Sequence, residues 1–292
     1  MAVAKKATAK AAAPPKKATA KKAVPPKKAA AKKSAGARTS RLPEKIRPLD
    51  EGLTSYVRMM IYGDPGVGKT PLAATAPNAL ILEADRGEES AVFNGSTAKK
   101  WVLEDYNDST EAYNYLRAGG TKDFDWLILD GITMFQERGL DHIMADLVAA
   151  KPHRFEYAPD KGEFGQNMNR IAKFIRDLKD LPINLILTAH AMVSERELAD
   201  GSTITSMMPA VQGRLMPQKI CGYVGIVAHL QTVQSKKDAD KDYPVLSTRR
   251  IDGWYGKDRY SAIGRMPNPT IPKVLAAIEK RRNAADTPTK EK

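Results

Sequence analysis

The chain has 292 residues, and its 47 Lys and Arg residues against 34 Asp and Glu residues give a formal net charge of +13. The first 41 residues hold 13 basic and no acidic side chains, so residues 42–292 carry 34 of each sign and are neutral overall. No apolar run approaches the roughly 20 residues of a membrane span, and the N-terminus lacks the apolar centre of a secretory signal. The single cysteine excludes an intramolecular disulfide. The sequence therefore predicts a cytoplasmic protein without a membrane partner.

Residues 1–41 are almost entirely Ala, Lys, Pro, Thr and Val, with Pro-Pro-Lys-Lys at 14–17 and again at 25–28. This composition offers no apolar face to offset the entropy of ordering, so we expect a disordered basic tail. Such a polycation gains affinity for nucleic acid by releasing counterions from phosphates. The alternative is a solubilising extension. The folded body is expected at 42–283, and 284–292 is expected to be a short polar tail.

Apolar runs and helical periodicities alternate between residues 56 and 188, which predicts a mostly parallel sheet between helices. Strands are expected at Tyr56–Tyr62, Ala79–Glu83, Trp101–Leu103, Trp126–Leu129 and Leu185–Thr188. Helices are expected at about 70–76, from a capping box formed by Asp108 and Glu111 to Gly119-Gly120, at 134–149, and at Phe164–Asp180.

The last third of the chain changes character, because its short strands follow one another without intervening helices. Val193–Leu198 and Thr203–Met207 flank Asp200-Gly201, which predicts a β-hairpin. Val224–Leu230 and Val245–Ile251 are two further strands, so one edge of the sheet is expected to be antiparallel. A final helix is expected at about 272–282. The predicted fold class is therefore α/β, with an antiparallel edge.

The strongest motif is G-x-x-x-x-G-K-[ST], between a predicted strand and a predicted helix. Its residues are Gly63, Asp64, Pro65, Gly66, Val67, Gly68, Lys69 and Thr70. In such a loop, backbone N–H groups and the helix N-terminus surround phosphate groups, the lysine reaches the terminal phosphates, and the hydroxyl ligates Mg²⁺. The motif predicts bound ATP and Mg²⁺; the alternative is an ordinary glycine-rich turn.

A second set of polar residues stands at the ends of neighbouring predicted strands. Asp130 is the expected second metal-holding residue, and the residue after it is Gly131 and not Glu. A water-activating carboxylate must then come from elsewhere, and Glu83 and Asp85 are candidates that would share a face if their strand extends that far. His190 is a candidate sensor of the γ-phosphate. Surface caps and a structural histidine are the alternatives.

Together these residues resemble the RecA/RadA-like recombination ATPases, in particular small phage-encoded single-domain members associated with single-strand annealing, over roughly residues 52–265. The resemblance implies a RecA-like core, ATP hydrolysis and a homo-oligomeric ring or filament. Asp85 matches the family's catalytic carboxylate, and His190 stands where a polar residue, often Gln, ends a strand. The sequence Gly256-Lys257-Asp258-Arg259-Tyr260 is similar to a family signature whose basic residues, here Lys257 and Arg259, reach the neighbouring subunit's γ-phosphate. The alternative is a solvated basic turn.

By the same resemblance, residues 193–219, with Arg196, Arg214 and Lys219, occupy the place of the DNA-binding loops, so single-stranded DNA is the expected partner. The expected role is phage recombination or single-strand annealing, in the host cytoplasm if the source is viral. A helicase loader or packaging ATPase, a P-loop small-molecule kinase and a non-enzymatic DNA-architectural protein are the competing functions.

Overall fold

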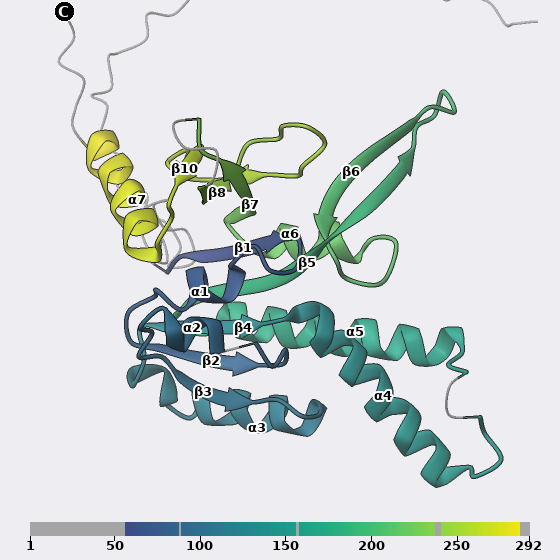
Figure 1. The fold of residues 1–292 in the computed structure, drawn as a ribbon. Coiled ribbons are helices and arrows are strands. Elements are labelled where there is room, and N and C mark those ends of the chain that lie inside the picture. Colours follow the sequence, from purple (N-terminus) through teal and green to yellow (C-terminus); the bar gives the residue numbers. More distant parts are fainter. Residues whose placement is uncertain (1–55, 88, 156–157, 237–240, 287–292) are drawn as a thin grey trace, which may run out of the picture. The chain divides into compact units, whose positions relative to one another are not determined.

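A ten-stranded, mostly parallel sheet forms the centre of the part of the chain that the computed structural model describes, residues 56–87, 89–155, 158–236 and 241–286 (Figure 1). The predicted basic tail at 1–41 lies outside these ranges, as do residues 287–292. The strands are β1 (Arg58–Gly63), β2 (Ala79–Glu83), β3 (Lys99–Val102), β4 (Trp126–Asp130), β5 (Asn184–Glu197), β6 (Thr203–Pro209), β7 (Ile226–Gln234), β8 (Asp242–Ser247), β9 (Lys257–Asp258) and β10 (Arg265–Pro267). Their order is β10-β8-β7-β1-β5-β4-β2-β3, with β6 paired to β5 and β9 to β7.

The five strand pairs from β7 to β3 are all parallel, whereas β6, β8, β9 and β10 pair antiparallel. The central strands are continuous apolar runs because both faces of the sheet are covered by helices. The predicted fold class, an α/β core with an antiparallel edge, is confirmed.

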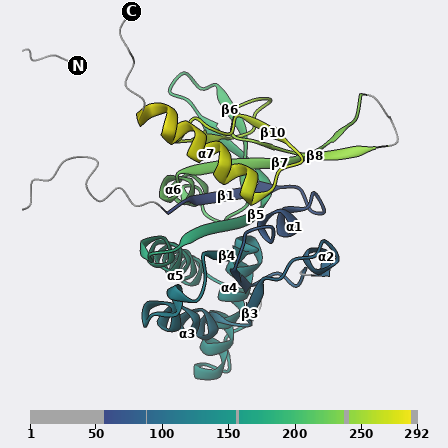
Figure 2. The same ribbon diagram turned by 90° about the vertical axis from the view of Figure 1, so that its left-hand side faces the viewer.

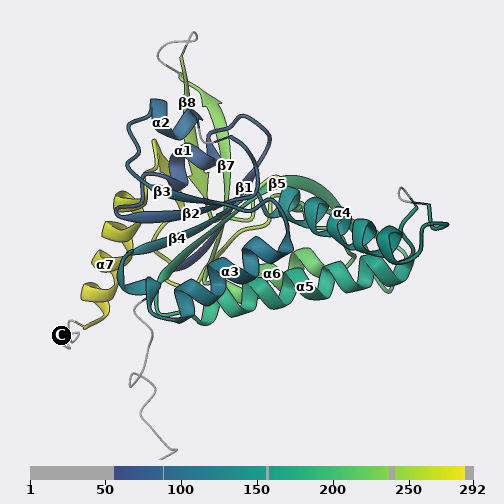
Figure 3. The ribbon, with the colours of Figure 1, turned by 90° about the horizontal axis from the view of Figure 1, so that it is seen from below.

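Two apolar clusters fill the two sides of the sheet. Alternate residues of β1 separate them: Met60 and Tyr62 belong to one cluster, Met59 and Ile61 to the other. On the first side pack α3 (Tyr106–Arg117), α4 (Ile132–Ala150), α5 (Lys161–Asp180) and α6 (Met216–Tyr223). On the second pack α1 (Lys69–Ala73), α2 (Glu89–Phe93) and α7 (Ile271–Asp286) (Figures 2 and 3).

The register of the parallel strands brings chemically important residues to one edge of the sheet, which we call the carboxyl edge. Gly63 at the end of β1 lies opposite His190 on β5, and Glu83 at the end of β2 lies opposite Asp130 at the end of β4. In open α/β sheets, ligands bind at this edge.

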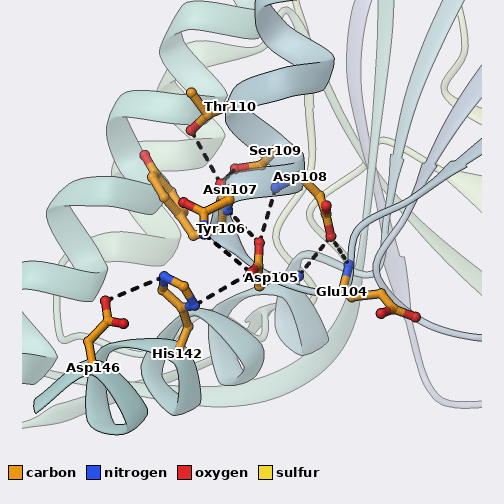
Figure 4. A network of polar contacts seen from close by, with 9 residues as sticks. All are labelled: Glu104, Asp105, Tyr106, Asn107, Asp108, Ser109, Thr110, His142 and Asp146. Carbon is orange, nitrogen blue, oxygen red and sulfur yellow. Dashed lines mark hydrogen bonds and ion pairs between the residues drawn. The ribbon is translucent and has the colours of Figure 1, made fainter. Parts of the chain in front are cut away.

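The capping box of α3 lies three residues earlier than predicted, at Asp105 and Asp108 (Figure 4). The Asp105 side chain accepts the N–H groups of Asn107 and Asp108, and the Asp108 side chain accepts the N–H of Asp105. The prediction of Asp108 and Glu111 is wrong because two successive acidic pairs share the same spacing, and only the structure shows which carboxylate meets the free N–H groups.

The predicted hairpin is present, but its first arm is the same strand as the core strand before it. β5 runs without interruption from Asn184 past His190 to Glu197 and turns back into β6, which projects from the sheet (Figure 1). No Pro or Gly interrupts the sequence between the two predicted strands. The segment after the hairpin, which had no predicted element, contains α6, with Pro217 in its first turn.

Other elements differ from the prediction at their ends or were missed. The last helix, α7, continues to Asp286, three residues past the predicted end of the body at 283. The short elements α2, β9 and β10 had no sequence signal. Among the described residues, no helix combines the length and apolar character needed to cross a membrane.

Candidate functional site

The glycine-rich loop connects β1 to α1 at the carboxyl edge, as the motif predicts. Gly66 and Gly68 have φ of 78° and 92°, in the left-handed region where a side chain is strained. Gly63 is required for a different reason, because a Cβ there would lie 2.4 Å from the carbonyl oxygen of Leu230 on β7. The loop therefore depends on backbone conformations that only glycine adopts readily.

Lys69 extends its ammonium over this loop. Its Nζ donates to the carbonyl oxygens of Gly63, at 3.1 Å, and Asp64, at 2.8 Å, and lies 3.5 Å from Nδ1 of His190. Burial lowers the pKa of Lys69, while the carboxylates of Asp130 and Asp85 act to raise it. The ammonium is thus a partly buried positive charge placed between the loop and His190 on β5.

Thr70 and Asp130 meet across the carboxyl edge. The Thr70 hydroxyl donates to Oδ2 of Asp130 at 2.8 Å, and the hydroxyl of Thr188 on β5 donates to Oδ1 at 2.5 Å. Asp130 is only 3% exposed, and burial raises its pKa, with the two threonine hydrogen bonds opposing that shift. The expected proximity of Asp130 to the glycine-rich loop is confirmed.

These donors fit a magnesium ion held jointly with phosphates. Mg²⁺ prefers oxygen ligands and is bound in nucleotide sites through one or two carboxylates plus phosphate oxygens. A hydroxyl and a carboxylate meet at Thr70 and Asp130, and the described residues contain no cluster of three or more His, Cys, Asp or Glu side chains that could hold a metal alone. The site is therefore suited to a metal that arrives with a nucleotide.

The two candidate carboxylates, Glu83 and Asp85, have different surroundings. β2 ends at Glu83 and Asp85 lies in the turn that follows, so the strand does not extend far enough for the two to share a strand face. Glu83 is 2% exposed and its carboxylate lies 3.2 Å from Nζ of Lys100. The Asp85 carboxylate is 43% exposed and lies 3.8 Å from Nε2 of His190. The geometry brings Asp85 to the loop and leaves Glu83 in the interior.

Gly131 occupies a position, directly after Asp130, where a side chain would not fit. Gly131 has φ of 86°, and a Cβ there would lie 2.5 Å from Cβ of Asp85. A glutamate after Asp130 would therefore be strained and would collide with the turn that carries Asp85. The absence of an Asp-Glu pair, noted in the sequence, has a steric cause.

One cavity of about 370 Å³ gathers these groups. Its lining is Pro65, Gly66, Gly68, Lys69, Thr70, Pro71, Asp85, Gly87, Ser90, Asp130, Gly131, Thr188, Ala189 and His190. A second cavity, of about 290 Å³, shares Gly68 and Pro71 with it and continues along α1 towards Pro244 and Pro269. The second cavity has no charged residue in its lining and is suited to a flat, uncharged group.

Lys257 and Arg259, the basic pair near the end of the chain, lie at the amino-terminal ends of the parallel strands, opposite the carboxyl edge. β9, which contains Lys257, pairs with the first residues of β7, whereas the glycine-rich loop follows the last residue of β1. The Lys257 ammonium donates to the carbonyl oxygens of Cys221 and Val224 at the end of α6, at 2.9 and 2.7 Å. Lys257 therefore stabilises a helix C-terminus. Arg259 is exposed.

The charges in residues 193–219 are unevenly distributed. The hairpin has Glu195, Glu197 and Asp200 against the single base Arg196, whereas the segment after it has Arg214 and Lys219 and no acid. Both of these bases are exposed. The uncompensated positive charge of this region therefore lies in the segment after the hairpin and not in the hairpin itself.

Two threonines that belong to no sequence motif take part in this region. Thr188 contacts Asp130, and Thr133 donates to the carbonyl oxygen of Ala210 and accepts the N–H of His190. The available signal was Thr188 itself, a hydroxyl at the end of an otherwise apolar buried strand. Thr133 carried no comparable signal.

A comparison with known protein families agrees with this geometry. A family model described as an AAA domain (AAA_24) matches residues 55–260, and the chain belongs to this family of P-loop ATPase domains. Among solved structures, the flagellar accessory protein FlaH from Methanocaldococcus jannaschii is similar over 72% of this chain and 84% of its own, with 8% sequence identity and a TM-score of 0.34. No curated protein sequence matches the chain.

We predict that Gly131→Ala lowers both thermal stability and ATP turnover. The left-handed conformation costs about 1–2 kcal/mol for a non-glycine residue, and the displaced Asp85 lowers turnover by about 10²-fold. Nucleotide affinity stays close to wild type because the glycine-rich loop is unchanged. Gly162→Ala is the control, since a Cβ there meets nothing within 4 Å. Wild-type turnover in Gly131→Ala would contradict the steric account.

Proposed function

We propose that the protein is a RecA/RadA-like, DNA-dependent ATPase. The observation that carries the ATPase assignment is the convergence of Lys69, Thr70, Asp130, Asp85 and His190 on one cavity at the carboxyl edge. Together these five side chains cover four tasks in phosphoryl transfer to water: phosphate binding, metal binding, water activation and detection of the terminal phosphate.

The two adjoining cavities would hold different parts of an ATP molecule. Lys69 and the loop N–H groups bind the β- and γ-phosphates, and the uncharged cavity along α1 holds the base. Thr70 and Asp130 would hold Mg²⁺, which would neutralise charge on the phosphate oxygens. Asp85 lines the phosphate cavity with a side chain that is 43% exposed, so its carboxylate could orient a water molecule and accept its proton.

His190 links the phosphate-binding lysine to this carboxylate. Because an ammonium only donates, Nδ1 of His190 accepts from Lys69, and Nε2 then carries the hydrogen and faces Asp85. A γ-phosphate competes for the Lys69 ammonium and so changes the partners of His190. Since β5 continues from His190 into the hairpin, the change is passed to the projecting arm.

We predict that Asp85→Asn lowers ATP turnover by about 10²–10⁴-fold while nucleotide binding is retained, since general base catalysis contributes that factor. Glu83→Gln is the matched variant: it weakens a buried ion pair and so lowers stability, but the folded fraction keeps its turnover. Phosphate release per folded molecule, measured with and without single-stranded DNA, separates the two. Equal losses in both variants would refute the assignment of Asp85.

We propose that the basic tail and the segment with Arg214 and Lys219 bind the phosphates of single-stranded DNA. Deletion of residues 1–41 is expected to weaken DNA binding and to flatten its dependence on salt, by about 0.7 in the logarithmic slope for each phosphate that the tail neutralises. ATP affinity should be unchanged. Fluorescence anisotropy at several salt concentrations measures the slope, and an identical slope in the truncated protein would show that the tail binds no phosphate.

We further propose that the protein acts as a homo-oligomer, a ring or a filament, in which Arg259 reaches the nucleotide of a neighbouring copy. Arg259 is exposed and directly follows β9, which pairs with the first residues of β7, at the opposite ends of the parallel strands from the phosphate cavity. A contact between Arg259 and the nucleotide would therefore be made to a second copy. A head-to-tail contact of this kind builds rings or filaments. A cation supplied in this way stabilises the charge of the transition state.

Mixing two inactive variants tests this contact. Arg259→Ala alone should lower turnover by about 10²-fold or more, and Lys69→Ala should abolish ATP binding. In mixed oligomers the Lys69→Ala copies supply Arg259 to the copies that still bind ATP, so turnover should rise above that of either variant. No gain on mixing would rule out the contact in trans.

The biological setting that fits the resemblance is phage recombination or single-strand annealing. A helicase loader or a packaging ATPase would share the same site, and these roles differ in their response to DNA and to partner enzymes. A small-molecule kinase would release no phosphate into water and would not respond to DNA. The complete set of side chains in the phosphate cavity favours an active ATPase over a purely architectural protein.

A further inference from the structure

The Thr188 hydroxyl contacts both the last residue of β4, Asp130, and the residue that follows it, Gly131. It donates to Oδ1 of Asp130 at 2.5 Å and accepts the backbone N–H of Gly131 at 2.8 Å. Thr188 is 1% exposed and lies on β5, the strand next to β4. Both hydrogen bonds are therefore shielded from water, and no solvent molecule can readily replace the hydroxyl.

The first contact fixes the orientation of the Asp130 carboxylate. Thr70 holds Oδ2 and Thr188 holds Oδ1, so the carboxylate group cannot rotate about its Cβ–Cγ bond without breaking one of the two bonds. A metal held by Thr70 and Asp130 needs its ligands in a near-ideal octahedral arrangement. Groups that orient a metal-binding carboxylate through hydrogen bonds affect metal affinity without touching the metal.

The second contact fixes the turn against which Asp85 packs. The Gly131 N–H is held by Thr188, and the position of a Cβ on Gly131 would be 2.5 Å from Cβ of Asp85. The two turns are thus in close contact, and a shift of the Gly131 backbone displaces Asp85. The Thr188 hydroxyl therefore contacts both Asp130, the proposed metal ligand, and the turn that packs against Asp85, the proposed water-activating residue.

We propose that Thr188 is a positioning residue that sets the geometry of both Asp130 and Asp85, and thereby couples magnesium binding to water activation. This inference rests on the proposed ATPase function. It assigns Thr188 a role that it performs through its hydrogen bonds to Asp130 and Gly131.

Thr188→Val and Thr188→Ser form the test. Valine keeps the shape of the side chain and removes the hydroxyl, whereas serine keeps the hydroxyl. Binding of a fluorescent ADP analogue is measured across a magnesium titration, together with ATP turnover at saturating magnesium. In Thr188→Val we expect the half-saturating magnesium concentration to rise by about 10- to 100-fold, with affinity for the analogue in EDTA unchanged. Turnover at saturating magnesium should also stay below wild type, because Asp85 is displaced.

Thr188→Ser should behave as wild type in both measurements. A residue with only a structural role would change the unfolding temperature of Thr188→Val but not its magnesium dependence, and that outcome would overturn the proposal, as would a Thr188→Ser variant that matches Thr188→Val. Should the valine variant fail to fold, Thr188→Ala against Thr188→Ser makes the same comparison. A wild-type protein that binds no nucleotide refutes the proposed function, whereas a wild-type protein that binds it with no effect of Thr188→Val refutes this inference alone.

Discussion

The hydrogen bond between the Thr70 hydroxyl and the Asp130 carboxylate is the interaction on which the functional site depends. It joins the start of α1 to the end of β4, two segments that are 60 residues apart in the sequence. The parallel order of β1, β5 and β4 brings them together, because β1 and β4 end at the same edge, where β5 passes between them. A buried carboxylate at this edge is stable only with such partners, since an unpaired buried charge carries a large desolvation cost.

Strand β5 connects the parts of the site that differ in chemistry. Within three residues it supplies Thr188, which contacts Asp130, and His190, which lies beside Lys69. The same strand then leaves the sheet as the first arm of the hairpin. Side chains two apart on a strand share a face, so both point to the cavity. In the function proposed above, a rearrangement of His190 on release of the terminal phosphate would act on a continuous strand that leads to the hairpin.

Much of the fold and of the site was predictable from sequence, for identifiable reasons. Buried parallel strands are apolar runs, and the glycine-rich motif requires a strand before it and a helix after it, so β1, β4 and the loop were found at nearly the correct residues. The continuity of β5 was missed because its apolar half and its polar half resemble separate strands. The choice between Glu83 and Asp85 depended on where β2 ends, and the role of Gly131 depended on its approach to a distant turn. Such tertiary contacts have no local signal.

The most direct test of the account is a crystal structure of the protein with magnesium and a non-hydrolysable ATP analogue. The account predicts a metal ion about 2.0–2.1 Å from the Thr70 hydroxyl oxygen, with the Asp130 carboxylate directed at it and the γ-phosphate between Lys69 and Asp85. A triphosphate bound elsewhere, or a metal ion remote from both Thr70 and Asp130, would contradict the central claim.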